Sequence, residues 1–283
     1  MECPLLVWML ALNRDVTTAE YDTCYHLVRE CAPYANIPYS PTSIESFRKI
    51  ISQMLPLLMM RHRRISRSKW KHFEANGKHW IEQASDDMPP EKFLQSMIGY
   101  HLSYENSLCG MVMTQGRQRQ VVNIGLGLKQ LAVEPRGVSV PAYVESLAHK
   151  LTPLEMSFIT PDVGDEVALR RLCIILSLKA AYVNATVPRT GCDLSRIEFN
   201  IPNETARIDD HPLQGWEFRV YKAQLGVART GNVIEESYQC ACAFFRGTKE
   251  SKFIWHDNSK DLEAWVQFIN IDQMVKVIPK LTA

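Results

Sequence analysis

Hydrophobic positions in the first sixty residues follow two spacings, one typical of strands and one typical of helices. A continuous apolar run predicts a buried strand over residues 5–12, and the following spacing predicts a helix over 18–31. A second helix is expected to begin near Thr42, because Thr42 and Glu45 have the spacing of a capping box. Pro56 is expected to kink or end this helix, since proline removes a backbone donor.

The rest of the chain mixes strands with a long helix. Residues 108–113 and 121–128 predict a hairpin around the polar turn 115–118. Thr152 and Glu155 form a second capping box, and the apolar segment 165–185 predicts a buried helix. Further strands are expected over 197–201, 215–222 and 238–245. This order predicts an α+β fold with two lobes, 1–119 and 120–283.

Composition narrows the possible partners and locations. The 283 residues include 32 Lys and Arg against 31 Asp and Glu, so the net charge of +1 offers no overall field for nucleic acid or an anionic membrane. The apolar runs are shorter than the roughly 20 residues of a membrane helix, and the first lacks the flanks of a signal peptide. The eight cysteines show no CxxC pair. We expect a reduced cytoplasmic protein with no nucleic-acid or membrane partner.

One local charge feature stands out between residues 61 and 80. It holds seven basic residues against the single acid Glu74, with aromatic and histidine side chains interleaved. Such a segment either binds phosphate groups or an acidic protein, or is simply a solvated surface. The basic residues are Arg61, Arg63, Arg64, Arg67, Lys69, Lys71 and Lys78.

Residues 176–185 and 192–199 together resemble the third signature of the 4′-phosphopantetheinyl transferase superfamily, a W-x-x-K-E-(A/S) helix followed by a DLxRIEF strand. Three further segments match in order. Residues 77–79 resemble a G-K-P turn, 101–104 an N-x-S-H strand end, and 124–129 a G-(V/I)-D-(V/I)-E strand. The resemblance covers about residues 45 to 245 and points to the two-lobed, monomeric branch of the family.

The resemblance implies two similar α+β lobes related by a pseudo-twofold axis, with coenzyme A bound in the cleft between them. In active members, the strand Asp and Glu and the helix Glu hold Mg²⁺ against the diphosphate, because a hard dication takes oxygen ligands. The helix Lys and acid assist attack by the serine of a carrier protein. This chemistry needs carboxylates, because charge that builds up on the diphosphate must be neutralised by the bound ion.

In this sequence Gly127, Lys129 and Ala180 stand at the three acidic positions, which changes the local formal charge from −3 to +1. A magnesium site of the family kind is therefore not expected, and no other metal ligands are predicted. Of the remaining motif positions, the helix Trp, the later helix Lys, the strand-end His and the turn Pro are replaced by Leu176, Asn184, Tyr104 and His79.

We therefore predict a phosphopantetheinyl transferase-like protein repurposed for metal-free proton transfer, such as dehydration, isomerisation or cyclisation, on a small-molecule substrate of secondary metabolism. Lys179 is expected either to contact a phosphate or the substrate, or to act as a base whose pKa is lowered by Lys129 across the cleft. The predicted catalytic residues are Lys179, Tyr104, Glu105 and His101, and the predicted residues for a retained coenzyme A are Lys78, Arg61, Arg64 and Lys129.

Two other functions stay open at this point. One is a non-catalytic protein that binds coenzyme A or an acyl carrier protein, and the other is a residual transferase whose Mg²⁺ is held by the diphosphate. Each candidate residue also has an ordinary structural interpretation. Lys179 would extend from its helix to solvent, and Lys129 would be solvated. His101, Tyr104 and Glu105 would form hydrogen bonds to the backbone of a loop.

Overall fold

The computed structural model describes residues 4–84, 88–186, 192–229 and 231–281. The chain mixes helices with several sheets, which confirms the α+β class. The segment 187–190, where the match to the family pattern is weakest, lies outside the described residues. Among the residues described, no helix is long and apolar enough to cross a membrane.

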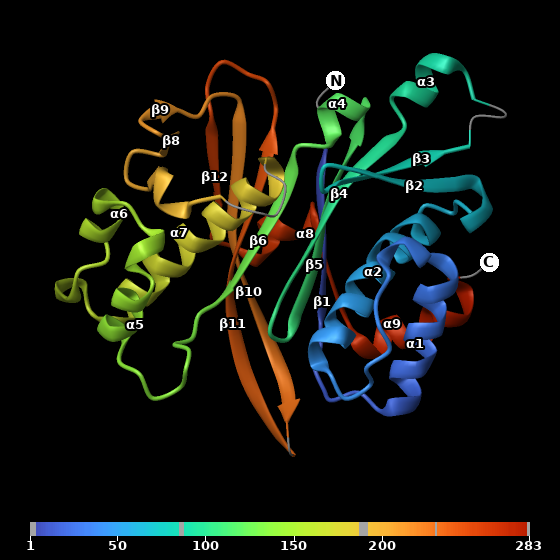
Figure 1. Cartoon of the computed structure of the whole chain (residues 1–283), viewed down its shortest axis with the longest axis horizontal. Helices are drawn as coiled ribbons and strands as arrows, with labels where there is room; N and C mark the ends of the chain where they lie inside the picture. Colours follow the sequence, from blue (N-terminus) through green and yellow to red (C-terminus); the bar gives the residue numbers. More distant parts are fainter. Residues whose placement is uncertain (1–3, 85–87, 187–191, 230, 282–283) are drawn as a thin grey trace.

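The first sheet has six strands, and β13 runs parallel to β1 whereas the other neighbours are antiparallel. Strand β13 comes from the far end of the chain and lies at the edge of this sheet (Figure 1). In spatial order the strands are β13 (Val266–Asn270), β1 (Leu5–Ala11), β5 (Leu108–Gly116), β4 (Met97–Glu105), β3 (Lys78–Gln83) and β2 (Trp70–Ala75).

The second sheet has four strands, and a small third sheet lies near it. In spatial order the second sheet consists of β12 (Lys252–His256), β10 (Trp216–Arg229), β11 (Asn232–Phe245) and β6 (Ile124–Gln130). The third consists of β7 (Ile197–Asn200), β8 (Thr205–Ile208) and β9 (His211–Pro212). Strands β10 and β11 are each longer than the sequence predicts at the turn that joins them.

Helices cover the outer sides of the two large sheets (Figure 1). On the first sheet lie α1 (Thr18–Cys31), α2 (Ile44–His62) and α9 (Ile271–Val277), and on the second lies α7 (Asp165–Thr186) with α5 (Val140–Ser146) and α6 (Pro153–Ser157) beside it. The shorter helices are α3 (Pro90–Leu94), α4 (Gln118–Val121) and α8 (Ser259–Glu263).

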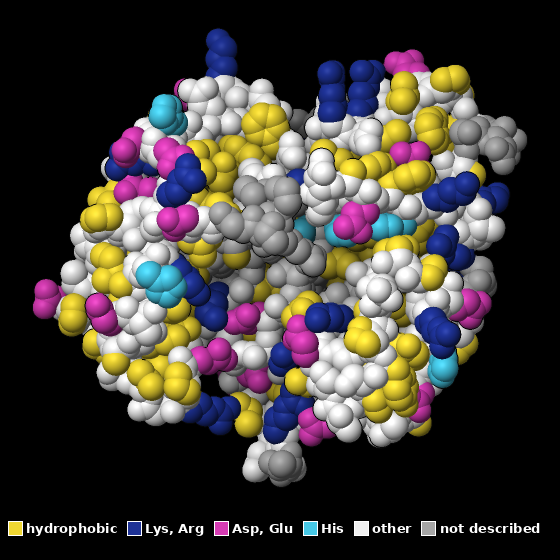
Figure 2. All heavy atoms as spheres, viewed as in Figure 1, with side chains coloured by type: hydrophobic (Ala, Val, Ile, Leu, Met, Phe, Trp, Pro, Cys, Tyr) yellow, Lys and Arg dark blue, Asp and Glu magenta, His cyan; other side chains and the backbone are white. Residues whose placement is uncertain are grey.

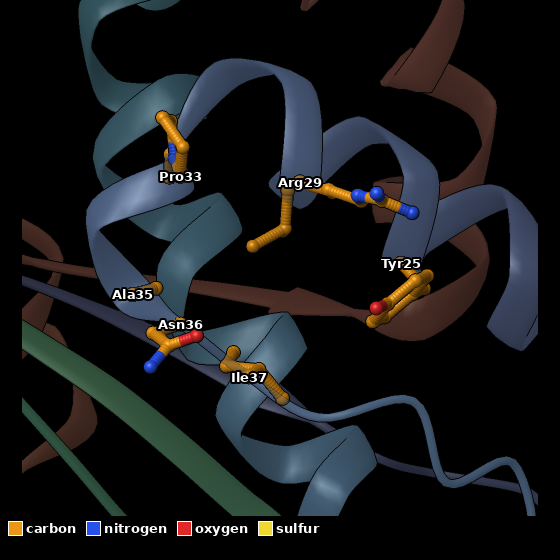
Figure 3. A pocket seen from close by; sticks show the side chains of 8 residues that line it. Tyr25, Arg29, Pro33, Ala35, Asn36 and Ile37 are labelled. Atoms are coloured by element: carbon orange, nitrogen blue, oxygen red, sulfur yellow. The ribbon is translucent and has the colours of Figure 1, made fainter.

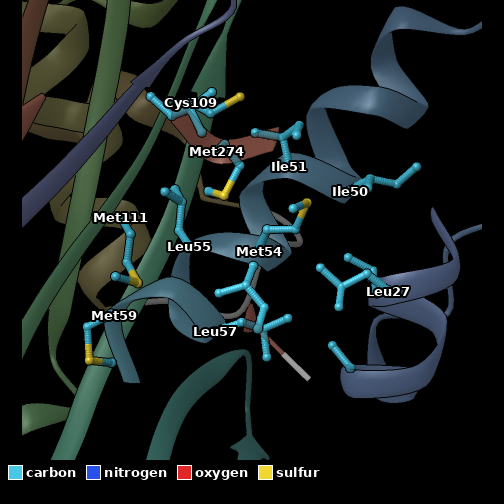
Figure 4. Packing of buried hydrophobic residues seen from close by; sticks show 14 of the residues in the cluster. Leu27, Ile50, Ile51, Met54, Leu55, Leu57, Met59, Cys109, Met111 and Met274 are labelled. Carbon is cyan, nitrogen blue, oxygen red and sulfur yellow. The ribbon is translucent and has the colours of Figure 1, made fainter. Parts of the chain in front are cut away.

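The core therefore has layers on both sides of each large sheet. Side chains of α1, α2, β5 and α9 meet over the first sheet, as Figure 4 shows for Leu27, Met54, Met111 and Met274. A second cluster fills the space between the two sheets, where Val7 of β1 belongs to the same cluster as Leu126 and Tyr238. Burial of these apolar side chains fixes the two sheets against each other.

Two predictions about local structure are corrected. Helix α2 begins close to Thr42, as expected, but its cap is Ser43, whose hydroxyl accepts a hydrogen bond from the Ser46 amide, and the helix does not end at Pro56 but continues to His62. Its buried apolar face keeps the helix together although proline removes one backbone donor. Residues 108–113 and 121–128 do not form a hairpin, because Val121 ends α4 and β6 pairs with β11 of the other sheet.

The lobe boundaries at 1–119 and 120–283 stay a prediction. Strand β13 and helix α9 belong to the C-terminal segment, yet β13 pairs with β1 and α9 packs into the core beside α1 and α2. The end of the chain thus completes the first sheet.

Candidate functional site

Two glycines bring β6 into close contact with α7. Ile124, Leu126 and Leu128 face the core between the sheets, so the alternating residues Gly125 and Gly127 face the helix. A Cβ atom on Gly127 would lie 2.0 Å from the carbonyl oxygen of Ser177, and one on Gly125 would lie 2.1 Å from that of Ala181. The backbone of α7 therefore leaves no space for a side chain at either position.

This contact bears directly on the magnesium site that the resemblance implies. Gly127 stands at the first acidic position and is packed against helix backbone, Lys129 stands at the second, and Ala180 stands at the third. None of these residues offers the oxygen ligands that Mg²⁺ requires. The three positions do not fit the ion.

Lys129 has its own acidic partner. Its ammonium lies 2.9 Å from a carboxylate oxygen of Glu105, and both side chains are about a quarter exposed. Burial lowers the pKa of Lys129, but the Glu105 hydrogen bond and nearby carboxylates outweigh burial and leave it raised. The ion pair joins β6 to β4 and keeps Lys129 charged.

Lys179 lies inside the protein rather than reaching solvent. Its ammonium contacts Glu155 at 2.6 Å and donates hydrogen bonds to the carbonyl oxygens of Lys150 at 2.7 Å and Leu194 at 2.9 Å. Neither charged side chain is exposed. These three oxygens match the three donors of the ammonium group, so the alternative interpretation, in which Lys179 extends to solvent, does not hold.

The capping box at α6 explains how this buried pair is held. The Glu155 carboxylate also accepts hydrogen bonds from the backbone amides of Thr152 at 2.8 Å and Phe199 at 2.9 Å. Burial lowers the pKa of Lys179 and raises that of Glu155, and each charge partly offsets the shift of the other. Burial, rather than the charge of Lys129, is the largest cause of the lowered pKa of Lys179.

The three predicted catalytic residues on β4 lie on two different sides of the first sheet. The Tyr104 hydroxyl donates a hydrogen bond to Glu45 of α2 at 2.6 Å, on the helix side of the sheet. His101 is buried on the other side, where its Nδ1 accepts a hydrogen bond from the Leu126 amide at 3.4 Å, and Glu105 binds Lys129 there. The structure therefore brings Glu105 and Lys129 together but separates them from Tyr104.

Lys78 joins the first sheet to α7. Its ammonium lies 3.5 Å from the carbonyl oxygen of Asn184, near the C-terminal end of the helix, where the helix dipole favours a cation. Burial lowers the pKa of Lys78 to about 8. The Asn184 side-chain amide in turn donates to the carbonyl oxygen of Leu126 at 2.9 Å, so β3, α7 and β6 meet at this point.

The other basic residues do not form one patch. Arg61 and Arg64 are exposed near the end of α2, whereas Arg63 donates to Gln115 at 2.6 Å. Arg67 binds the carbonyl oxygen of Cys31 at 2.9 Å and covers the Trp70 ring. Figure 2 shows Lys and Arg side chains dispersed among acidic and hydrophobic ones on this face.

A cavity of about 280 Å³ lies between α1 and the 3-10 helix η1 (Pro33–Ala35) that follows it. Figure 3 shows Tyr25, Arg29, Asn36 and Ile37 around this cavity. Its lining contains none of the predicted catalytic or coenzyme A-binding residues. The cavity is therefore separate from the point where Lys78 meets α7.

Sequence reasoning missed the hairpin formed by β2 and β3, which carries Lys78. Asn76 and Gly77 at its tip are the strongest short signal of a hairpin, because both residues adopt the positive φ angles of a tight two-residue turn. The hairpin also places His72, Glu74 and His79 close together. The same Asn-Gly pair predicts this grouping.

Comparison with known proteins gives one informative match. The search against family models found no match. The chain is 28% identical over 194 residues to a protein of Paxillus involutus that is named 4′-phosphopantetheinyl transferase pptA. The matched segment covers 66% of this chain and 69% of the relative.

Proposed function

This chain belongs to the 4′-phosphopantetheinyl transferase superfamily, and from this membership we propose that it binds an anionic, phosphate-bearing ligand without the family's magnesium-dependent transfer. The observation that carries the proposal is the contact of Gly127 with the backbone of α7. A carboxylate at this position would require the helix to move away from β6. Mg²⁺ transfer chemistry therefore lacks its ligand and the space for it.

The finer architecture belongs to the same proposal. Each large sheet carries a long helix on its outer side, α2 on the first and α7 on the second, and the inner sides of both sheets share one core. This arrangement supports two lobes related by a pseudo-twofold axis, with the ligand cleft between them. The proposed boundaries are 1–119 and 120–283, with β13 and α9 added to the first lobe.

Lys78 is the proposed ligand contact. It is half-buried, and burial has lowered its pKa to about 8. An anion placed beside it would stabilise the ammonium charge that burial disfavours. Coenzyme A is the ligand that family membership favours, because it carries a diphosphate and a 3′-phosphate. Arg61 and Arg64 are exposed cations of the same half of the chain and are proposed as secondary contacts.

The transfer chemistry is tested by intact mass. An apo acyl carrier protein is incubated with this protein, coenzyme A and excess Mg²⁺, beside an active transferase as a positive control. We expect no gain in the mass of the carrier when the control is fully converted. A gain of one phosphopantetheine arm would contradict the proposal and would favour a residual transferase whose metal is held by the diphosphate.

Ligand binding is tested by calorimetric titration with coenzyme A, with and without Mg²⁺. We expect saturable binding that does not require Mg²⁺, and a loss of about tenfold in affinity for Lys78→Met, which removes a charge-assisted contact. Lys71→Met is the matched control, because Lys71 is an exposed lysine at the other end of the same hairpin. The absence of binding, or equal losses in both variants, would contradict a role for Lys78.

A second function is favoured by one specific contact. The Tyr104 hydroxyl and the Glu45 carboxylate share a 2.6 Å hydrogen bond at a partly exposed position, and this hydrogen bond lowers the pKa of Glu45. Such a pair is able to pass a proton to or from a small molecule, as metal-free dehydration or isomerisation in secondary metabolism would require.

This second function is tested by incubating the protein with a metabolite extract and following the composition by mass spectrometry. Loss of one water, or a change of retention at constant mass, is expected with the wild type and not with Tyr104→Phe. Tyr39→Phe is the control, because the Tyr39 hydroxyl also donates to a carboxylate, that of Asp22. An unchanged extract would remove this alternative.

A further inference from the structure

The β2–β3 hairpin has a rigid two-residue turn. Asn76 and Gly77 both have positive φ angles, 51° and 69°, which is the backbone of a type I′ turn. This turn fits the twist of the strands and fixes their register, so Glu74 pairs with His79 and His72 pairs with Ile81. The positions of the side chains along the hairpin are therefore well determined.

This register gathers three ligand-type side chains on one face. His72 and Glu74 lie two residues apart on β2 and share a face, and His79 lies directly opposite Glu74 on β3. His72 Nε2 lies 3.2 Å from His79 Nδ1, which in turn lies 3.6 Å from a carboxylate oxygen of Glu74. All three ligand atoms lie within 4.8 Å of one another.

The distances from His79 Nδ1 to His72 and to Glu74 are close to those between two ligands of a tetrahedral metal ion. With metal to nitrogen bonds of about 2.0–2.1 Å, two ligands of a tetrahedral ion lie roughly 3.3–3.4 Å apart. Two histidines and one carboxylate are also a common ligand set of zinc. We propose that His72, Glu74 and His79 bind a divalent transition metal ion such as Zn²⁺.

Aromatic contacts hold the two imidazoles in place. The Tyr34 ring of η1 stacks on His72 with 3.6 Å between ring centroids, and Tyr100 of β4 lies beside His79 at 5.7 Å. Both histidines are half-buried, whereas Glu74 is exposed. Figure 2 shows histidine and acidic side chains together in a recess beside the β2–β3 hairpin. The fourth ligand position would open toward solvent and take water.

The proposed metal site is distinct from the cleft contact of Lys78. Successive residues of a strand point to opposite faces, so Lys78 and His79 lie on different sides of the hairpin. His79 also stands at a motif position where the family turn carries proline. The proposal replaces the expectation from sequence that the chain has no metal ligands.

The experiment uses the full chain after treatment with a chelator. Co²⁺ is titrated in as a spectroscopic substitute for Zn²⁺, and we expect one equivalent to produce the visible absorption bands of a tetrahedral Co²⁺ complex. Competition with Zn²⁺ then removes these bands. A wild-type protein that binds no equivalent of Co²⁺, or binds it without tetrahedral bands, would overturn the proposal.

Variants locate the site. Loss of an outer contact to a metal ligand typically weakens binding tenfold to a hundredfold, so Glu74→Gln and His79→Gln are each expected to weaken Co²⁺ binding by at least about a hundredfold. Glu74 is exposed, so Glu74→Gln keeps the test valid should His79→Gln fail to fold. His149→Gln, at an exposed histidine elsewhere, is the control and is expected to bind as the wild type does. Unchanged binding in Glu74→Gln would overturn the assignment.

Discussion

The contact between β6 and α7 and the β2–β3 hairpin both carry family motifs, but they handle charge in opposite ways. At the first, Lys179 is buried against Glu155, and Lys129 is paired with Glu105. On the hairpin, Lys78 reaches only a backbone carbonyl among the contacts described, and two histidines gather beside an exposed acid. The comparison indicates that the lysines of the first region are engaged in ion pairs within the protein, whereas the second region holds groups that are suited to ligands.

The largest expected effect comes from breaking the buried ion pair. Lys179→Met leaves the Glu155 charge buried without its partner, and the free energy of unfolding is expected to fall by about 3–5 kcal/mol in urea denaturation. Arg170→Met, at an exposed position of the same helix, is the control and is expected to stay within about 0.5 kcal/mol. A loss below about 1 kcal/mol for Lys179→Met would mean that the pair does not hold α7.

The next effect concerns the glycine contact. Gly127→Ala places a Cβ atom against the backbone of Ser177, which cannot yield without shifting α7, so a loss of about 3 kcal/mol in unfolding free energy is expected. Gly226→Ala is the matched control, because a Cβ atom there meets only Val233 at 3.4 Å. Equal stability of the two variants would show that α7 can move, and would reopen a carboxylate site at residue 127.

A smaller effect is expected in the pH dependence of coenzyme A binding, which follows the charge of Lys78. Its pKa of about 8 means that most of the ammonium groups are charged at pH 7 and few at pH 9. Since an anion binds the charged form, affinity for coenzyme A is expected to fall about tenfold between these values. Lys78→Met is expected to remove that dependence in the same calorimetric titration. A pH dependence that survives in Lys78→Met would point to another group.

The smallest effect is expected at the partly exposed pair of Lys129 and Glu105. Lys129→Met is expected to lower the unfolding free energy by about 1 kcal/mol or less, because solvent screens the pair. Thermal and urea denaturation measure this change. A loss comparable to that of Lys179→Met would show that the two ion pairs are equally structural and would weaken the distinction drawn between buried and accessible charge.

Much of the fold follows from local patterns in the sequence. The first strand, helix α1 and the capping box of Thr152 and Glu155 are where periodicity and cap residues place them. Helix α2 passes through Pro56 because tertiary packing of its apolar face outweighs one lost hydrogen bond. The incorrect hairpin after residue 108 reflects long-range pairing, since β6 finds its partner β11 more than a hundred residues later.

The candidate site was harder to predict. The replaced acids are visible in the sequence, but the close approach of α7 to Gly127 is a property of the packed helix. The burial of Lys179 likewise depends on oxygen atoms of Glu155, Lys150 and Leu194. No local sequence pattern predicts that these three residues lie beside Lys179. The grouping of His72 with His79, in contrast, follows from the Asn76-Gly77 turn and strand alternation.

The parallel pairing of β13 with β1 has a consequence for how the chain folds. Val7 lies opposite Val266, 259 residues later, so the first sheet gains its edge strand only after residue 266 has been synthesised and has left the ribosome. Until then β1 has an open edge that is able to pair with another chain. Such distant contacts also slow folding, because a long loop must close before they form. Nascent chains stalled before residue 266 are therefore expected to be prone to aggregation and to need chaperones.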